Sequence, residues 1–166
     1  IKTKKELVKS LFNKVSNQYD LMNDLMSFGL HRLWKKDLIK NIDTINPSLI
    51  LDLAGGTGDI TKQLSKKFKE STIIIYDLSY EMIKKARHRI NNKKLFFING
   101  SAELISLPSN CIDLATLSFG LRNFSNVELA IQECYRVLKY GGKVYCLEFS
   151  PSYSKLIKPS YDFYSN

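Results

Sequence analysis

The stretch LDLAGGTGD, residues Leu51 to Asp59, places three glycines between a short apolar run and a helical pattern. In an open α/β sheet, ligands bind at the turns that follow the carboxyl ends of the strands. Gly55, Gly56 and Gly58 permit backbone angles and close approaches that a side chain would prevent. The stretch therefore predicts a strand, a ligand-binding turn and a helix, with a tight turn that binds nothing as the alternative.

Outside this stretch, apolar runs that suit strands alternate with helical patterns. Strands are expected at 49–53, 72–77, 95–99, 112–118 and 143–149, and helices at 59–68, 79–90 and 127–138, the last ended by Gly141 and Gly142. Strands that are apolar on both faces and separated by helices are typical of a parallel sheet covered on both sides. The sequence therefore predicts an α/β fold with a doubly wound, mostly parallel sheet.

The first 48 residues follow a different pattern. Apolar residues recur at helical spacing in 4–15 and 33–42, and Pro47 closes this section. We expect residues 1–48 to form a helical lid over an α/β unit of residues 49–166, within one structural domain. Only residues 151–166 follow the last strand, whose free edge would invite aggregation, so further strands are expected in the complete protein.

Composition limits the classes of partner. The 166 residues are 44% apolar, enough for a core without disulfides or metals, and no apolar run approaches the ~18 residues of a spanning helix. The formal charge of +9 comes with 20 Lys and 5 Arg that are spread over every helix. Nucleic-acid readers rely on Arg and on basic stripes, so no nucleic acid is expected as a partner. Attraction to an anionic membrane surface stays open.

The cysteines and histidines give no sign of a metal site. Cys111, Cys134 and Cys146 form no CxxC pair, and each lies among apolar residues, which favours reduced core thiols in a cytosol-like compartment. His31 and His88 are the only histidines, and no spacing of His and Cys suits zinc. We therefore expect no metal.

The charge of the glycine turn selects among nucleotide ligands. A dinucleotide site has the fingerprint GxGxxG, and counting from Gly56 puts Thr61 at its last position, so the fingerprint fails. Asp59 places a carboxylate at the helix start, where it would repel a pyrophosphate, and Asp52 adds a second negative charge. The turn is therefore expected to suit a cationic ligand.

Asp77 lies 22 residues beyond Gly55, at the carboxyl end of the second expected strand. An acid at about this distance accepts hydrogen bonds from both hydroxyls of a ribose. A nucleoside with a positively charged amino-acid tail meets both demands, which predicts S-adenosylmethionine as the cofactor. The alternative is that Asp77 only caps the helix after Leu78, in competition with Ser79.

Four segments together carry a family resemblance: YDLMNDLMSFGLHRLWK at 19–35, LDLAGGTGD at 51–59, LSFGLRN at 117–123 and YRVLKYGGKVYCLEFS at 135–150. From about Phe12 to Tyr164 the chain resembles the ubiquinone/menaquinone biosynthesis C-methyltransferases. The glycine turn is shared with many S-adenosylmethionine enzymes, whereas SFGLHRLWK and SFGLRN are specific. The resemblance implies the Rossmann-like sheet of the class I methyltransferases. Family members continue past YDFYS into two more strands, which this chain lacks.

A set of positions is expected to contact the cofactor, among which Thr57, Asp77, Ser101, Ala102 and Ser118 are those that the resemblance implies. Those in and before the glycine turn are Asp52, Gly55, Gly56, Thr57 and Gly58, and those beyond it are Asp77, Leu78, Ser101, Ala102 and Ser118. Ser101 departs from the family, which usually has Asn or Asp there. Its hydroxyl can still bond one group on the adenine edge.

The implied reaction is methyl transfer from the sulfonium to a ring carbon of a reduced polyprenyl quinol. Arg122 beside the quinol oxygen would lower the pKa of that oxygen, with Asn123 next to it. The alternative is that Arg122 only holds the Asn or a nearby carboxylate in a loop. Tyr19 and Asn23 either line the ring pocket or pack within the lid. His31 is a second candidate base or a structural histidine.

The resemblance implies a polyprenyl quinol substrate, which is a benzoquinol, a naphthoquinol or both. It also implies peripheral contact with the membrane, and other quinone-biosynthesis enzymes or a second copy of the chain as partners. The expected location is cytoplasmic, at the inner membrane surface, or the matrix side of a mitochondrion in a eukaryote. Two alternatives come from other classes: methylation of RNA or another small molecule, and a non-catalytic cofactor-binding scaffold in a quinone-synthesis complex.

Overall fold

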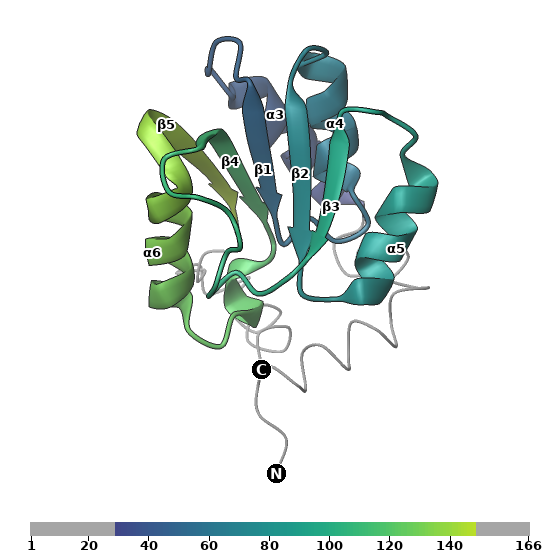
Figure 1. Ribbon diagram of the computed structural model, residues 1–166. Helices are drawn as coiled ribbons and strands as arrows, with labels where there is room; N and C mark the ends of the chain where they lie inside the picture. The colour runs from purple at the N-terminus through teal and green to yellow at the C-terminus, as the bar shows by residue number, and fades with distance from the viewer. Residues whose placement is uncertain (1–28, 149–166) are drawn as a thin grey trace, which may run out of the picture.

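The computed structural model describes residues 29–148, which form a five-stranded sheet with helices on both faces (Figure 1). The strands are β1 (Leu49–Leu53), β2 (Thr72–Asp77), β3 (Leu95–Asn99), β4 (Ile112–Ser118) and β5 (Leu138–Leu147). They lie in the order β3-β2-β1-β4-β5, and every neighbouring pair is parallel. The predicted doubly wound, parallel sheet is confirmed.

The helices divide between the two faces of the sheet. Helices α3 (Leu30–Asn41), α4 (Asp59–Lys67) and α5 (Tyr80–Arg89) pack on one face, and α6 (Val127–Val137) packs on the other. Figure 1 shows α3 and α4 behind the strands. Along β1, Ile50 joins the core cluster of α3 and α4, whereas Leu51 joins that of α6. Both faces bury apolar residues, which explains the nearly continuous apolar strands.

The order of the strands reverses at β1, because β2 and β3 lie on one side of it and β4 and β5 on the other. Helices α4 and α5 connect β1 to β2 and β2 to β3 on one side of β1, and the segment 100–111 then crosses to β4 on the other side. Ligands bind at such a reversal, outside the carboxyl ends of the strands. The fold therefore directs the search for a site to the ends of β1, β2 and β4.

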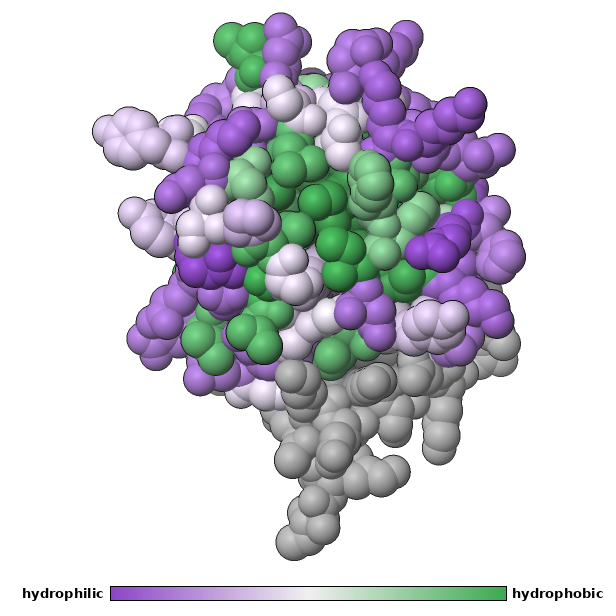
Figure 2. All heavy atoms as spheres, viewed as in Figure 1, coloured by the Kyte–Doolittle hydropathy of each residue, from purple (hydrophilic) through white to green (hydrophobic). Residues whose placement is uncertain are grey.

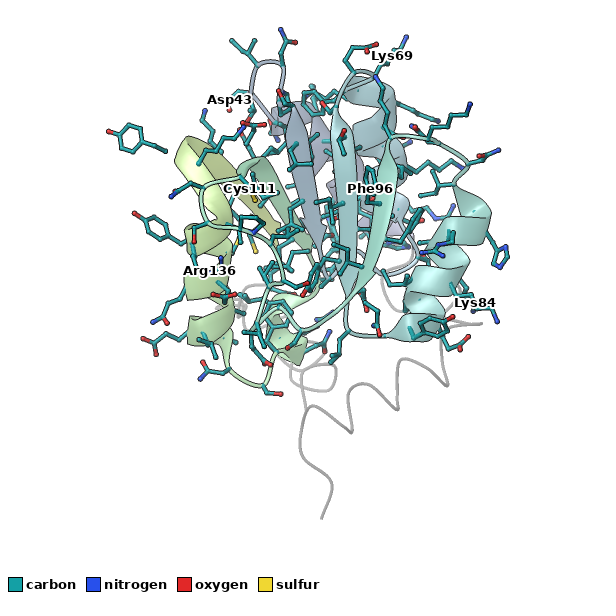
Figure 3. All side chains as sticks on the ribbon, in the orientation of Figure 1. Asp43, Lys69, Lys84, Phe96, Cys111 and Arg136 are labelled. Atoms are coloured by element: carbon teal, nitrogen blue, oxygen red, sulfur yellow. The ribbon has the colours of Figure 1, made fainter. Side chains whose placement is uncertain are left out.

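The segment 100–111 is fixed to α6 on the face opposite α3 and α4. Arg136 of α6 donates hydrogen bonds to the carbonyl oxygens of Ile105 (2.8 Å) and Leu107 (2.9 Å), and Figure 3 shows this side chain on α6. The connection that leads from β3 to β4 is thus anchored to α6 at both of these carbonyl groups.

Apolar residues gather on the same face of the molecule in Figure 2, and Phe96 of β3 is 55% exposed.

Helix α3 begins at Leu30, three residues before the expected start, and is fastened at its C-terminal end. Lys67 Nζ donates to the carbonyl oxygens of Ile39 (2.6 Å) and Ile42 (2.7 Å), groups that a helix end leaves without partners. Just beyond, Asp43 accepts a hydrogen bond from the Tyr145 hydroxyl of β5. Ile39 and Ile42 are also buried in the same core cluster as α4. Helix α3 therefore packs as part of the α/β unit.

The expected helix cap at Gly141 and Gly142 is wrong. Helix α6 ends at Val137, and β5 begins at the next residue. Gly141 has a φ of +79° within β5, where the register with β4 shifts, and a Cβ on Gly142 would lie 3.1 Å from the carbonyl oxygen of Ile112. The two glycines therefore accommodate an irregularity in strand pairing, not the end of a helix.

The three cysteines differ in exposure. Cys134 is buried, Cys111 is half-buried and Cys146 is exposed, so the expectation of core thiols holds for Cys134 and is wrong for Cys146. Cys146 lies on β5, at an edge of the sheet that residues 29–148 form. Within those residues, no group of three His, Cys, Asp or Glu side chains could hold a metal ion. No helix in the same range is long and apolar enough to cross a membrane.

Candidate functional site

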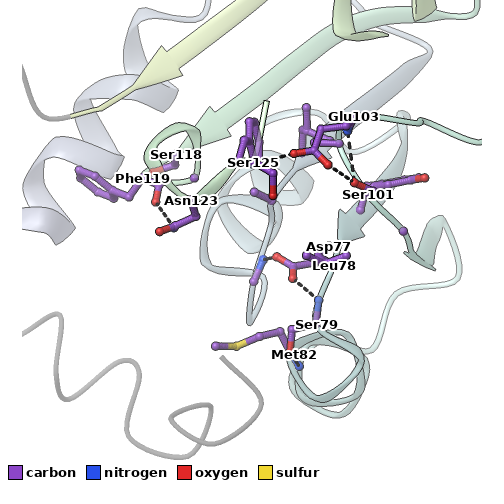
Figure 4. Close-up of a pocket in the computed structure, with 18 residues that line it drawn as sticks. Asp77, Leu78, Ser79, Met82, Ser101, Glu103, Ser118, Phe119, Asn123 and Ser125 are labelled. Carbon is purple, nitrogen blue, oxygen red and sulfur yellow. Dashed lines mark hydrogen bonds between the residues drawn. The ribbon is translucent and has the colours of Figure 1, made fainter. Parts of the chain in front are cut away.

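A pocket opens at the carboxyl ends of β1, β2 and β4, where the order of the strands reverses (Figure 4). Its lining residues come from four segments, 53–56, 76–82, 100–103 and 118–125. The predicted residues that line it are Gly56, Asp77, Leu78, Ser101, Ala102, Ser118 and Asn123. The structure thus brings together most of the expected cofactor positions that follow the ends of the strands.

Asp77 joins the glycine turn to the start of α5. One carboxylate oxygen accepts a hydrogen bond from the backbone N–H of Gly56 (2.9 Å), and the other accepts from the N–H of Ser79 (2.8 Å) (Figure 4). Burial raises the pKa of Asp77. Each oxygen retains a second lone pair that a ribose hydroxyl can use. Ser79, not Asp77, is the N-cap of α5, because its hydroxyl accepts from the N–H of Met82 (3.3 Å).

The glycines of the turn meet different surroundings. Gly56 has a φ of +55°, and a Cβ added there would find nothing within 4 Å, so the missing side chain leaves open space. A Cβ on Gly55 would lie 2.8 Å from Cγ2 of Ile75, and one on Gly58 would lie 2.6 Å from Cδ1 of Ile90. Of the three, Gly56 lines the pocket, whereas the other two permit close packing behind the turn.

Asp52 lies beneath the turn and does not line this pocket. It is 1% exposed and accepts hydrogen bonds from the hydroxyls of Thr61 (2.6 Å) and Thr116 (2.9 Å). Burial raises the pKa of Asp52 to about 6, against the lowering effect of the two hydroxyls. Through these contacts Asp52 links β1 to α4 and β4.

Thr57 and Asp59 contact cations on neighbouring helices. The Thr57 hydroxyl accepts from Arg89 Nη1 (2.7 Å), and Thr57 does not line the pocket. Asp59 forms ion pairs with Lys35 and Arg89, each at 3.0 Å. Burial opposes ionisation of Asp59, but the two cations outweigh it and lower the pKa. The argument that Asp59 would repel a pyrophosphate therefore does not hold, because its charge is balanced.

Glu103 is a pocket residue that the sequence analysis missed. It accepts a hydrogen bond from the Ser101 hydroxyl (2.9 Å) through one oxygen. Its other oxygen accepts from the backbone N–H of Ser125 (2.6 Å), as Figure 4 shows, and from that of Asn126 (3.0 Å). The sequence does contain a signal for this role, because Glu103 follows the expected adenine contact Ser101 by two residues. Glu103 thus holds the segment with Ser101 against the start of α6.

Ser118, at the end of β4, places a hydroxyl group among the apolar residues that line the pocket. The Ser118 hydroxyl oxygen is buried and has no hydrogen-bond partner within residues 29–148. A buried hydroxyl left unbonded costs on the order of 1–3 kcal/mol, which favours a ligand that bonds it. Met82, Phe119 and Phe124 line the pocket nearby and were not identified from the sequence. The pocket thus offers both apolar contact and hydrogen-bonding groups, as a nucleoside requires.

Arg122 and Asn123 lie in a short 3₁₀ helix, η1 (Leu121–Asn123), which the sequence pattern does not indicate. Asn123 lines the pocket, and its side-chain amide donates to the carbonyl oxygen of Phe119 (3.4 Å). Arg122 does not line it; Nη1 lies 3.9 Å from Glu148 Oε1. Arg122 thus contacts a carboxylate just after the end of β5, although its neighbour Asn123 lines the pocket.

The remaining candidate site residues, His31, Tyr19 and Asn23, are not among the described residues that line this pocket. His31 is 4% exposed in the first turn of α3 and does not line the pocket. Tyr19 and Asn23, like the expected helix at 4–15, lie outside residues 29–148. Their roles stay predictions.

Comparison with solved structures supports the fold. An S-adenosylmethionine-dependent methyltransferase from Aquifex aeolicus has a TM-score of 0.68 and 20% identity, over 76% of this chain and 69% of that one. At this identity the likeness shows the fold alone. The chain therefore has the fold of the class I methyltransferases, with its pocket at the carboxyl ends of the strands.

Within that class, the chain belongs to the ubiE/COQ5 methyltransferase family, whose model matches residues 1–166. It is 43% identical to the ubiquinone/menaquinone biosynthesis C-methyltransferase UbiE of Hydrogenovibrio crunogenus, over 99% of this chain and 67% of the relative. The UbiE protein of Rickettsia bellii is 44% identical, over 98% of this chain and 68% of that protein. The chain spans about two thirds of the length of these curated relatives. The family resemblance seen in the four segments is confirmed.

Proposed function

We propose that this protein transfers a methyl group from S-adenosylmethionine to a ring carbon of a reduced polyprenyl quinone precursor, a benzoquinol or a demethylmenaquinol. The observation that carries the proposal is the 43% identity, across nearly the whole chain, to a ubiquinone/menaquinone biosynthesis C-methyltransferase. The pocket supports it independently, because its lining suits a nucleoside. Methylation of RNA and a purely scaffolding role have no comparable observation behind them.

The residues of the pocket fit the cofactor. Asp77 would accept the ribose hydroxyls, Ser101 and Ala102 would border the adenine, and the buried Ser118 hydroxyl would gain a hydrogen-bond partner. The open space at Gly56 would let the amino-acid tail pass close to the backbone. When bound, S-adenosylmethionine supplies a methyl group that the positively charged sulfur makes electrophilic.

Arg122 and Asn123 are proposed to prepare the acceptor. A guanidinium near the quinol oxygen would lower the pKa of that oxygen, and the resulting phenolate carries electron density onto the ring carbon. Arg122 keeps its proton, so it would stabilise the phenolate and not remove the proton itself. The side chain is 34% exposed beside Glu148, which leaves it able to contact a ring that enters from outside. Asn123 would orient that ring from the pocket wall.

The quinol substrate also bears on location and partners. A prenyl tail keeps such a molecule in a lipid bilayer, and the formal charge of +9 would favour contact with an anionic membrane surface. We therefore propose peripheral membrane contact on the cytoplasmic side, or the matrix side in a mitochondrion. Other quinone-biosynthesis enzymes or a second copy of the chain remain the proposed protein partners.

A calorimetric titration with S-adenosylmethionine, with NADH as control, tests the cofactor assignment first. Saturable binding of S-adenosylmethionine alone is expected, because the turn lacks the dinucleotide fingerprint. The protein should then methylate a reduced demethylquinol with a short prenyl tail, as detected by mass spectrometry. Binding of NADH but not of S-adenosylmethionine would overturn the proposal.

A further inference from the structure

A second hollow lies across the glycine turn from the first pocket. Lys35 of α3 lines it, together with Asp52, Gly55, Thr57 and Asp59. Four residues line both hollows, namely Ala54, Gly56, Ser118 and Phe119. The two hollows are therefore neighbours that share the turn as a common wall.

Lys35 is a nearly buried cation with few acceptors. Its side chain is 10% exposed, and Nζ donates to Asp59 Oδ2 at 3.0 Å. Asp59 is its one hydrogen-bond partner within residues 29–148, whereas an ammonium group has three N–H donors. A buried charge is stable only when it is paired and hydrogen-bonded, so a second acceptor at this position would be favourable.

The neighbours of Lys35 hold it in place. Asp59 is also paired with Arg89 at 3.0 Å, and Arg89 in turn donates to the Thr57 hydroxyl at 2.7 Å. Trp34, the residue before Lys35, stacks at a tilt on Phe119, with ring centroids 6.4 Å apart. The position of Nζ is therefore fixed through Asp59 of α4 and Arg89 of α5 as well as by α3 itself.

The open space at Gly56 offers the amino-acid tail of the cofactor a path out of the first pocket. If Asp77 binds the ribose, the amino-acid tail leaves the sugar beside Gly56, the residue whose missing Cβ leaves open space and which lines both hollows. That path leads from the first hollow toward Lys35. The tail ends in a carboxylate, which is the acceptor that an ammonium prefers.

We propose that Lys35 binds the carboxylate of the amino-acid tail of S-adenosylmethionine, and that Asp59 and Arg89 position it for this contact. The inference rests on the proposed function, since it requires the cofactor in the first pocket. Lys35 then makes the site selective for the complete amino acid over the same nucleoside without its carboxylate. The ion-pair network under the turn serves ligand recognition as well as packing.

The test uses calorimetry to measure the affinities of the protein for S-adenosylmethionine and for decarboxylated S-adenosylmethionine. The second ligand keeps the sulfonium and the amine but lacks the carboxylate. Wild-type protein should bind the complete cofactor more tightly, by on the order of tenfold to a hundredfold, as expected for a hydrogen-bonded charge pair. Lys35→Met should bind the two ligands with similar affinity, because it keeps the length of the side chain and loses the charge. Lys36→Met is the matched control, since Lys36 is exposed on the same helix.

The outcomes separate the two proposals. If wild-type protein binds neither ligand, the proposed function is overturned. If wild-type protein binds both ligands equally, or if folded Lys35→Met keeps the wild-type preference, only the role of Lys35 is overturned. Circular dichroism shows whether Lys35→Met folds. If Lys35→Met does not fold, Lys35→Arg replaces it; this variant keeps the positive charge and should retain part of the preference for the complete cofactor. The wild-type comparison needs no variant and stands in either case.

Discussion

The carboxylate of Asp77 accepts a hydrogen bond from the backbone N–H of Gly56 at 2.9 Å, although the two residues lie 21 positions apart in the chain. The same carboxylate accepts from Ser79, so it holds the glycine turn against the start of α5. The conformation of the turn and the proposed contact with the ribose therefore depend on one side chain. Changes at Asp77 should affect both at once.

Replacing Asp77 with Ala should abolish measurable S-adenosylmethionine binding, because it removes the ribose acceptor and leaves two N–H groups unbonded. Asp77→Asn retains the shape and one oxygen, and a loss of roughly tenfold to a hundredfold in affinity is expected from the missing charged acceptor. Calorimetry measures both affinities, and thermal unfolding of the free proteins shows whether the turn is still held. Wild-type affinity in Asp77→Ala would contradict the ribose assignment.

Replacing Arg122 with Met should leave S-adenosylmethionine affinity unchanged, because Arg122 does not line the pocket. Methyl transfer should slow by roughly a hundredfold or more, as is typical when a stabiliser of developing negative charge is lost. The rate of the variant should recover as the pH rises, since the quinol then ionises without help. Single-turnover rates across a pH series check this. Equal loss of cofactor binding in the Arg122 and Asp77 variants would refute the division of roles.

Gly55→Ala and Gly56→Ala form a pair that separates packing from ligand contact. A Cβ on Gly55 would press on Cγ2 of Ile75, which is fully buried, so unfolding free energy should fall by roughly 1–3 kcal/mol. A Cβ on Gly56 meets no protein atom, so the positive φ alone costs about 1–2 kcal/mol of stability. Cofactor affinity should fall far more in Gly56→Ala. Urea unfolding and calorimetry of both variants test the contrast, and the reverse order of affinities would contradict it.

The three inner strands, β1, β2 and β4, could be predicted to the residue, because each is an apolar run that is buried on both faces. Strand β5 could not. A glycine pair after an amphipathic helix is typical of a helix end, and the same pair also suits the irregular register that β5 adopts. Only the packing of Gly142 against the backbone of Ile112 distinguishes the two cases.

The site divides in a similar way. Asp77 was predictable from its spacing beyond Gly55 and its place at the end of a strand, whereas Ser101 and Ser118 were expected only from the family resemblance, and all three line the pocket. The direction of the Thr57 side chain was not predictable, since no periodicity governs a turn. The partners of Asp59 come from helices whose relative placement depends on tertiary packing, so its balanced charge could not be seen in the sequence.

Asp52 should make the stability of the free protein depend on pH. Its folded-state pKa of about 6 is above the ordinary value of 3.8, so the folded state binds more protons between these values. Stability contributed by Asp52 is therefore present at low pH and lost as the pH rises from about 4 to about 6, by at most about 3 kcal/mol. Asp52→Asn lacks this titration, so its stability relative to wild type should increase over that range.

Urea unfolding of both proteins at several pH values across this window measures the difference in unfolding free energy. All other groups titrate alike in the two proteins, so the difference isolates Asp52. Parallel pH profiles for the two proteins would show that Asp52 does not titrate with a raised pKa.

Helix α3 is held to the rest of the fold at its C-terminal end. Asp43 is tied to Lys143 and Tyr145 of β5, and Lys67 holds the end of the helix. Asp43 and Lys67 therefore hold the C-terminal end of α3 against β5 and α4. Loosening the far end of α3, at Asp43, should then weaken cofactor binding through Lys35 without altering any residue that lines the first pocket.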